Sequence, residues 1–196
     1  MARLALAIFD QTRSVHGLGD RERDWLEFGA LLHDVGVHIS YERHHRHSYY
    51  LIKNGDLRGF HPDEIEVIAL VARYHRRGTP KRSHDEYSNL SGPLRRTVRT
   101  LSSILRVAES LDRSHAQAIT ALELRDRGED MLLVVHTGTD AELEVWATNR
   151  HLQPFEKLLG KPVRLESATT PQPPVATPPP RRKHHPLKSK AKAAAA

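Results

Sequence analysis

The sequence predicts a mainly α-helical protein: a bundle of five or six helices, then a small β-β-α-β appendage, then a disordered C-terminal tail. Three observations support this fold class. Apolar residues recur at helical spacing up to about residue 113, alternate with polar residues after His115, and give way to proline and lysine from residue 168. We therefore expect a helical domain over residues 1–115, an α/β appendage over 116–167 and a tail over 168–196.

The first two predicted helices are separated by glycines. Apolar residues at helical spacing predict one helix over residues 2–15, which Gly17 and Gly19 end. Asp20 is the expected N-cap of the second helix, because its carboxylate can accept hydrogen bonds from the free N–H groups of the first turn. This second helix should run to about His33.

Three more helices are expected before the fold changes character. The third covers about residues 44–54, where Gly55 supplies a left-handed C-terminal cap. The fourth begins at Pro62, because proline is favoured in the first turn of a helix. A polar connection over residues 79–93 follows, and the fifth helix covers about residues 94–113.

The appendage is predicted from a switch in periodicity. Residues 119–125 and 131–136 have the apolar character of strands, and the polar segment between them predicts a hairpin. Residues 140–159 return to helical spacing, although Pro154 is expected to kink or split that helix. A last strand is expected over residues 163–166.

The charge of the chain is distributed unevenly. The net charge is +6, but six of the 30 basic residues lie from residue 168 onward, where no Asp or Glu occurs. The folded part is therefore formally neutral, with 24 residues of each sign. The tail is either a solubilising extension or a basic arm that gathers polyanions such as nucleic acid or polyphosphate. Outside the tail, nucleic acid is not an expected partner.

Composition also restricts the cellular environment and the kinds of metal site. The chain contains no cysteine, so disulfides and thiolate metal sites are excluded, and a metal must be held by His, Asp or Glu. No apolar run approaches the length of a membrane span, and the N-terminal segment does not have the form of a signal peptide. We expect a cytoplasmic protein that does not contact the membrane.

The stretch from residue 28 to residue 47 contains the most informative motif, the adjacent pair His33 and Asp34. An imidazole and a carboxylate together bind divalent metals such as Mg²⁺ or Mn²⁺. Later helices also direct polar groups along apolar stripes, and burying such groups is costly unless each is paired or binds an ion. The predicted metal ligands are His33, Asp34, His47, His75, Glu109 and Asp112, of which the first two are the candidate catalytic pair. Alternatively, His75 and Asp112 are hydrogen-bonded residues at helix ends.

Arginine and histidine residues surround these candidate ligands. The predicted phosphate-binding residues are Arg43, His44, His45, Arg46, Arg73, Arg76, Arg77, Arg106 and Arg113. Guanidinium groups match phosphate oxygens bidentately, and a metal with arginines is suited to hydrolysing a phosphate ester or anhydride. The alternative is a solvated helix face, which we prefer for Arg95, Arg96 and Arg99.

Three segments carry a resemblance to a known family: LLHDVGVHISYERHHRHSYYLIKNGDLRGF, EIEVIALVARYHRR and LRVAESLDRSH. His33 and Asp34 on a helix, with a later histidine and a final acid, resemble the HD superfamily of metal-dependent phosphohydrolases. More closely, over about residues 4–167, the chain resembles the C-terminal domain of the exopolyphosphatase and guanosine pentaphosphate phosphohydrolase family. The resemblance implies an HD-type helical bundle and polyphosphate or guanosine polyphosphate as the ligand class.

The chain departs from that family in three ways. In the family this domain follows two actin-like lobes that hold the phosphate loops and the catalytic glutamate, and no glycine-rich phosphate loop occurs here. Glu109 stands where the HD pattern usually has aspartate, so Asp112 is an alternative last ligand. The early histidine expected of HD enzymes is either His16 or missing.

Three hypotheses about function remain open at this point. The chain is a stand-alone HD-type phosphohydrolase acting on a phosphoanhydride or nucleotide. Alternatively, it is a non-catalytic binding or regulatory module for polyphosphate or guanosine polyphosphates, which either descends from the larger enzyme or partners separately encoded actin-like phosphatase lobes. In the third hypothesis it is a dimerisation domain that forms a homodimer through its helices.

Overall fold

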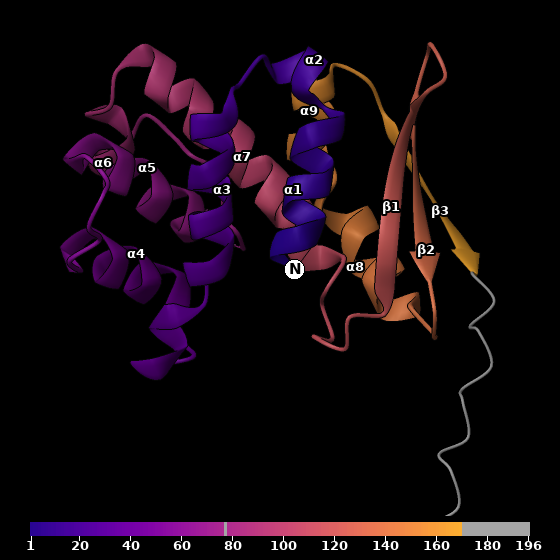
Figure 1. Cartoon of the computed structure of the whole chain (residues 1–196), viewed down its shortest axis with the longest axis horizontal. Helices are drawn as coiled ribbons and strands as arrows, with labels where there is room; N and C mark the ends of the chain where they lie inside the picture. The colour runs from indigo at the N-terminus through magenta and orange to yellow at the C-terminus, as the bar shows by residue number, and fades with distance from the viewer. Residues whose placement is uncertain (77, 170–196) are drawn as a thin grey trace, which may run out of the picture.

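The computed structural model describes residues 1–76 and 78–169, and it confirms a mainly α-helical fold with a small sheet (Figure 1). Helices α3 to α6 lie at one end and the sheet at the other, with α1, α7, α8 and α9 between them. One hydrophobic core runs through both parts, from Phe9 and Val71 to Leu133 and Phe155. The helical domain and the appendage are therefore packed on a shared core.

The helices are α1 (Ala2–Gln11), α2 (Arg13–His16), α3 (Asp20–Leu32), the 3-10 helix η1 (Val35–His38), α4 (His44–Asn54), α5 (Pro62–Arg73), α6 (Asp85–Ser88), α7 (Gly92–Ser110), α8 (Glu142–His151) and α9 (Gln153–Leu159). The strands are β1 (Ile119–Asp126), β2 (Met131–Thr137) and β3 (Val163–Thr169). In the part of the chain that the structure describes, no helix is both long and apolar enough to cross a membrane.

The ends of the first helices differ from the prediction. The predicted helix over residues 2–15 is broken at Thr12, whose hydroxyl donates to the carbonyl oxygen of Ile8 at 2.7 Å. Gly19, not Asp20, is the N-cap of α3, and its N–H donates to the Glu22 carboxylate at 2.8 Å. The bond between Gly19 and Glu22 thus stands at the helix start in place of the cap predicted at Asp20.

The ends of α4, α5 and α7 agree with the prediction only in part. Pro62 is the first residue of α5, as predicted, but Gly55 has φ −77° and ψ 152°, an extended conformation and not a left-handed cap. Helix α5 ends at Arg73 and α7 ends at Ser110, so His75 and Asp112 lie in the turns that follow. The directions of the His75 and Asp112 side chains therefore depend on these turns, and the helical spacing used in the prediction does not determine them.

The appendage has the predicted β-β-α-β order. Strands β1 and β2 form an antiparallel hairpin, and β2 pairs in parallel with β3 after the crossover through α8 and α9. The predicted helix over residues 140–159 is divided just before Pro154. Strand β3 continues to Thr169, two residues into the predicted tail, and residues 170–196 of that tail lie outside the described residues.

Helix α1 joins the two parts by protecting the edge of the sheet. The Gln11 amide donates to the carbonyl oxygen of Leu122 at 3.2 Å and accepts from the N–H of Leu124 at 2.8 Å. The Arg3 guanidinium donates to carbonyl oxygens at the start of β1. These side chains satisfy backbone groups that an exposed edge strand would leave free to pair with another chain.

Candidate metal centre

Three histidine rings from three different elements face one another. His33 follows α3, His44 begins α4, and His75 lies in the turn after α5. In each ring Nδ1 lies close to the carbonyl oxygen three residues earlier, at 2.8 Å for His33, 2.9 Å for His44 and 2.6 Å for His75. A carbonyl oxygen only accepts, so each Nδ1 must donate. In the neutral rings, Nε2 is therefore left with a free lone pair.

These Nε2 atoms meet two carboxylates. Asp34 oxygens lie 3.2 Å from Nε2 of His33, 3.2 Å from that of His44 and 3.6 Å from that of His75. Glu109 Oε2, from α7, is 3.5 Å from Nε2 of His33. We name these five residues, His33, Asp34, His44, His75 and Glu109, the His/Asp/Glu cluster. Ligand atoms of His33, Asp34 and His75 all lie within 4.8 Å of one another.

The bonding capacity of the cluster is incompletely used. His33 Nε2, Asp34 Oδ1 and Glu109 Oε2 are buried without a hydrogen-bond partner. Leaving such a group unsatisfied costs about 1–3 kcal/mol. Nε2 of His44 and Nε2 of His75 are 3.3 Å apart, and two lone pairs at that distance repel unless a proton or cation lies between them. The donor set therefore fits a cation bound among these atoms.

The pKa values of the cluster also indicate that its carboxylates stabilise a positive charge. Burial disfavours the charged His33 ring, but the negative charges of Asp34 and Glu109, 3.2 and 3.5 Å from Nε2, outweigh this and raise its pKa to about 9. Burial likewise opposes ionisation of Asp34, yet His33 lowers the pKa of that carboxyl to about 2. For His75, burial and the nearby His33 charge lower the pKa to about 4. One proton on His33 thus supplies part of what a metal ion would supply.

Gly36 explains how η1 and α4 approach closely enough to bring His44 to Asp34. A Cβ at this position would lie 2.3 Å from the backbone oxygen of His44 and 2.3 Å from the backbone nitrogen of Ser48. The Gly36 N–H donates to the Ser48 hydroxyl at 3.0 Å. Only glycine permits this contact, because the atoms on both sides are backbone.

The structure divides the predicted metal ligands. It brings His33, Asp34, His75 and Glu109 together and leaves the other two outside. His47 lies on α4, half-buried, with its Cβ beside Gly36. The Asp112 carboxylate is 3.0 Å from the amino group of Met1. Between the two candidates for the last ligand, the acid that reaches the cluster is thus Glu109.

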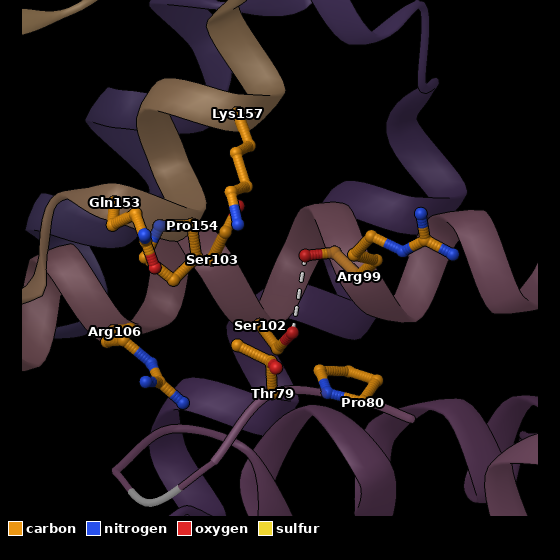
Figure 2. Close-up of a pocket in the computed structure, with 9 residues that line it drawn as sticks. All are labelled: Thr79, Pro80, Arg99, Ser102, Ser103, Arg106, Gln153, Pro154 and Lys157. Carbon is orange, nitrogen blue, oxygen red and sulfur yellow. Dashed lines mark hydrogen bonds between the residues drawn. The ribbon is translucent and has the colours of Figure 1, made fainter. Parts of the chain in front are cut away.

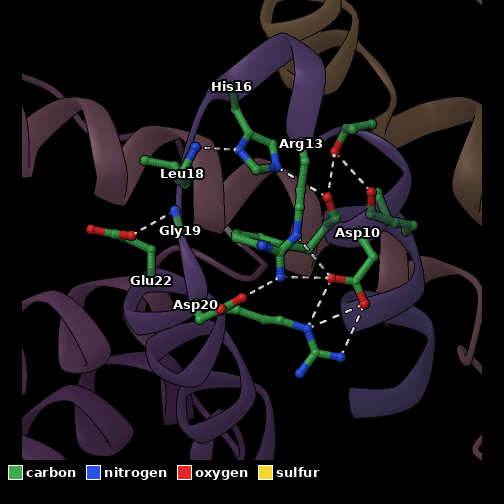
Figure 3. A network of polar contacts seen from close by, with 11 residues as sticks. Asp10, Arg13, His16, Leu18, Gly19, Asp20 and Glu22 are labelled. Carbon is green, nitrogen blue, oxygen red and sulfur yellow. Dashed lines mark hydrogen bonds and ion pairs between the residues drawn. The ribbon is translucent and has the colours of Figure 1, made fainter.

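Two histidines have different positions from those expected. His44 was predicted on a phosphate-binding surface, but its ring is part of the cluster. His16, the candidate early ligand, bonds to the carbonyl oxygen of Phe9 and to the N–H of Leu18 instead (Figure 3). No spacing in the sequence indicates His44, because a tertiary contact through Gly36 brings it to Asp34.

Several predicted phosphate-binding residues line a hollow next to the cluster. Its volume is about 410 Å³, and we name it the basic groove: Arg43, His45, Arg46, Arg73, Tyr74, Gly78 and His84. His45 and Tyr74 are the chain neighbours of His44 and His75, so the groove adjoins the cluster. The Arg73 guanidinium is paired with Glu86 at 2.7 Å, whereas Arg43 and Arg46 are exposed.

The remaining predicted phosphate-binding residues have separate surroundings. Arg113 pairs with Glu109 at 3.3 Å, at the edge of the cluster. Arg76 donates to the Tyr41 hydroxyl at 3.2 Å. Arg106 donates to backbone carbonyl groups and lines a different hollow, and Arg77 lies outside the described residues.

Comparison with known proteins agrees with the resemblance found in the sequence. A family model described as Ppx/GppA phosphatase, domain III, matches residues 1–153. The chain is also 45% identical over 47 residues to the guanosine-5'-triphosphate,3'-diphosphate pyrophosphatase of Pseudoalteromonas translucida. That alignment covers 24% of this chain and 10% of the relative, so the chain matches a small part of that protein. Because the family match extends over well more than half of its length, the chain belongs to the Ppx/GppA phosphatase family, in which it corresponds to domain III.

Proposed function

We propose that the His/Asp/Glu cluster binds one divalent metal ion and forms a phosphohydrolase centre for the phosphoanhydride bonds of polyphosphate or guanosine polyphosphate. The observation that carries this proposal is the convergence of three Nε2 atoms and two carboxylates with buried atoms that lack partners. In this proposal His33 and Asp34 are the catalytic pair, and His44, His75 and Glu109 complete the ligand set.

The donor chemistry favours particular ions. Imidazole nitrogen suits first-row transition ions, whereas Mg²⁺ prefers oxygen ligands in octahedral geometry. Three imidazoles and two carboxylates therefore favour Mn²⁺, Fe²⁺ or Zn²⁺ over Mg²⁺. When bound, such an ion polarises a phosphoryl oxygen and lowers the pKa of bound water.

The residues of the chain have distinct parts in this proposal. Asp34 is the most exposed member of the cluster, with 37% of its side chain accessible, so an entering ligand meets it first. Arg43 and Arg46 of the basic groove are exposed and can hold the non-bridging oxygens of a neighbouring phosphate, for which Arg43 would leave its ion pair of 3.7 Å with the exposed Glu42. Arg113 orients Glu109 through their ion pair.

The substrate class rests on the family and on charge. The chain belongs to a phosphatase family, and a relative is named as a guanosine-5'-triphosphate,3'-diphosphate pyrophosphatase. The basic groove is lined by three arginines and two histidines and by no acid. A ligand with several phosphate groups would span from the groove to the cluster.

A second candidate function is a binding module without turnover. It is favoured by the family match, which is to domain III alone, and by the alignment with the pyrophosphatase, which covers only 10% of that protein. The activity named for that relative is therefore not transferred by the alignment. In this alternative, separately encoded actin-like lobes or a second copy of the chain contribute the catalytic groups.

Metal analysis of protein purified without chelator tests the cluster. We expect about one transition ion per chain, lost in His33→Ala and Asp34→Ala because each substitution removes a ligand. His47→Ala is the matched control, since His47 lies outside the cluster, and it should retain the ion. Equal metal content in wild type and Asp34→Ala would overturn the metal site.

Hydrolysis assays then separate the two functions. Release of orthophosphate from polyphosphate or from guanosine pentaphosphate, abolished by chelation and by Asp34→Ala, supports the phosphohydrolase. If the metal is present but no phosphate is released, and polyphosphate binding survives chelation while Arg43→Ala and Arg46→Ala weaken it, the chain is a binding module.

A further inference from the structure

A second hollow lies between α7 and α9, and it shares no lining residue with the basic groove, although its Thr79 follows Gly78 of that groove in the chain. Its volume is about 260 Å³, and we name it the α7/α9 pocket. The side chains that matter for its chemistry are Thr79, Arg99, Ser102, Arg106, Gln153 and Lys157. Figure 2 shows Lys157 reaching from α9 and Arg106 reaching from α7 toward the space beside the hydroxyl groups of Ser102 and Thr79.

The lining of this pocket is cationic and has no compensating acid. Arg99, Arg106 and Lys157 line it, and an adjoining hollow shares Arg99 and Lys157 and adds Arg96. Among the described residues, none of these four cations forms an ion pair with a carboxylate. Glu156, the acid next to Lys157, is engaged elsewhere, because its Oε1 accepts from the N–H of Val163 at 3.0 Å.

Arg106 is the strongest observation, because it is buried and still lacks a negative partner. Its exposed fraction is 9%, and its Nη2 donates to the carbonyl oxygens of Tyr74, at 2.9 Å, and Gly78. Within the described part of the chain, its Nε and Nη1 make no hydrogen bond. Burial also lowers the pKa of this guanidinium. A buried cation without an anion is costly, so a bound anion would stabilise the arrangement.

The neutral groups of the pocket are also suited to an oxyanion. The Thr79 hydroxyl makes no hydrogen bond within the described residues, and the Gln153 amide is exposed at the rim. The Ser102 hydroxyl donates to the carbonyl oxygen of Arg99 at 3.2 Å, a bond that it can exchange for a ligand oxygen. Known sites for drug-sized ligands occupy roughly 300–1,000 Å³, so this smaller space suits a small anion.

We propose that the α7/α9 pocket is a second phosphate-binding site, which takes inorganic phosphate or pyrophosphate through Arg106, Lys157 and the hydroxyl groups beside them. The site does not depend on a metal ion and is separate from the His/Asp/Glu cluster, so it goes beyond the proposed function. Lys157 and Arg106 donate charge-assisted hydrogen bonds to the phosphate oxygens.

Calorimetric titration of the full chain with pyrophosphate in EDTA tests this site, because the chelator removes any metal from the cluster. Lys157→Ala should weaken binding by about tenfold or more, since it removes one charge-assisted hydrogen bond. Lys157 is exposed, so its truncation should leave the fold intact. Arg150→Ala is the matched control: it removes the same charge from exposed α8, outside the pocket, and should bind as wild type.

A local measurement distinguishes this pocket from the basic groove. In nuclear magnetic resonance titrations with orthophosphate and with pyrophosphate, the backbone amides of Ser102 and Ser103 should shift in wild type and in Arg46→Ala, but not in Lys157→Ala. Shifts confined to residues 43–46 would overturn the proposal, as would equal affinity in wild type and Lys157→Ala or no binding of either anion at millimolar concentration. A metal-free His/Asp/Glu cluster would leave all these outcomes unchanged.

Discussion

We name the polar contacts of Asp10, Arg13, His16, Leu18, Gly19, Glu22 and Arg23 the His16 corner. Like the His/Asp/Glu cluster it contains histidine and carboxylate side chains, but in the corner these side chains have hydrogen-bond partners. In the His16 corner both ring nitrogens have partners: Nε2 is 3.1 Å from the carbonyl oxygen of Phe9, and Nδ1 accepts from the N–H of Leu18 at 3.0 Å (Figure 3). In the cluster, by contrast, Nδ1 of each ring bonds to backbone while Nε2 faces other lone pairs.

The carboxylates of the two regions differ in the same way. Asp10 accepts from Arg23 and Arg13, and Glu22 accepts from the N–H of Gly19 (Figure 3). In the cluster, Asp34 Oδ1 and Glu109 Oε2 are buried without partners. These two regions therefore differ in unused bonding capacity and not in residue type.

The largest expected effect is stabilisation by metal, which should occur through the cluster and not through the corner. A ligand at 100 times its dissociation constant stabilises the native state by about 2.7 kcal/mol. Adding Mn²⁺ should raise the melting temperature of the wild type and of His16→Gln, but not of Asp34→Ala. Differential scanning calorimetry with and without the ion measures the shift.

If Mn²⁺ raised the melting temperature equally in wild type and in Asp34→Ala, the ion would not bind through the cluster, and the distinction between the two regions would fail. A loss of the shift in His16→Gln would likewise show that the corner is coupled to metal binding, against the geometry, in which both nitrogens of His16 are already engaged.

A pair of glycine substitutions compares the backbone of the two regions. Gly36→Ala places a Cβ 2.3 Å from backbone atoms of His44 and Ser48, and such overpacking costs about 1–3 kcal/mol or more. Gly19→Ala meets only Glu22 Oε2 at 3.5 Å, an ordinary contact, and should cost less than about 1 kcal/mol. Urea denaturation of the two variants measures the difference.

Metal affinity provides a second measurement on the same glycine pair. Gly36→Ala should weaken metal binding, because the contact that it disrupts holds His44 beside Asp34. Gly19→Ala should bind metal as wild type does. Equal affinity and equal stability in the two variants would contradict the part that we assign to Gly36.

Much of the fold was predictable because periodicity reports burial directly. The longer helices of the bundle, the hairpin and the last strand were expected from spacing, and Pro62 was correctly placed at the start of α5. The short helices η1 and α6 were not expected, and α6 lies within the polar connection predicted over residues 79–93. The errors are at helix ends, where local backbone geometry determines the boundary. The Thr12 hydroxyl bonds to the preceding turn and the helix breaks there, and Gly55 has an extended conformation in place of a left-handed cap. The spacing of apolar residues carries no information about such local geometry.

The candidate site was less predictable, because part of it depends on tertiary contacts. His33 and Asp34 are adjacent in sequence, so the motif alone indicated them. His44 needed the Gly36 contact, which no spacing rule contains. Helical spacing suggested Asp112 along with Glu109, but α7 ends at Ser110, so Asp112 lies beyond the helix and its side chain turns to Met1.

A smaller effect concerns the pH dependence of stability at the corner. Burial lowers the pKa of His16, because the charged ring is solvated less well there than in water. Below about pH 6.5, the ordinary pKa of histidine, the unfolded chain therefore binds more protons at this position than the folded chain. The contribution of His16 to stability is present above that pH and is lost as the pH falls.

Replacement by glutamine should remove this part of the pH dependence. His16→Gln retains a donor for the Phe9 carbonyl and an acceptor for the Leu18 N–H, but it does not titrate. Between pH 7.5 and 5.5, the free energy of unfolding in EDTA should fall less steeply for His16→Gln than for wild type, by urea titration at each pH. Parallel curves for the two proteins would contradict the assignment.

The smallest expected effect is at Asp10, where complete pairing contributes little because water reaches the pair. Hydrogen bonding to Arg23 lowers the pKa of this carboxyl, yet 41% of its side chain is exposed. Exposed ion pairs contribute about 0–1 kcal/mol, so Asp10→Asn should destabilise the chain by less than about 1 kcal/mol, and Asp56→Asn, at an isolated exposed pair, by less still. In 1 M salt, where the Debye length is about 3 Å, the difference should shrink. A large, salt-independent loss in Asp10→Asn would contradict this prediction, because it would show that the hydrogen-bond geometry at Asp10, and not a screened ion pair, stabilises the corner.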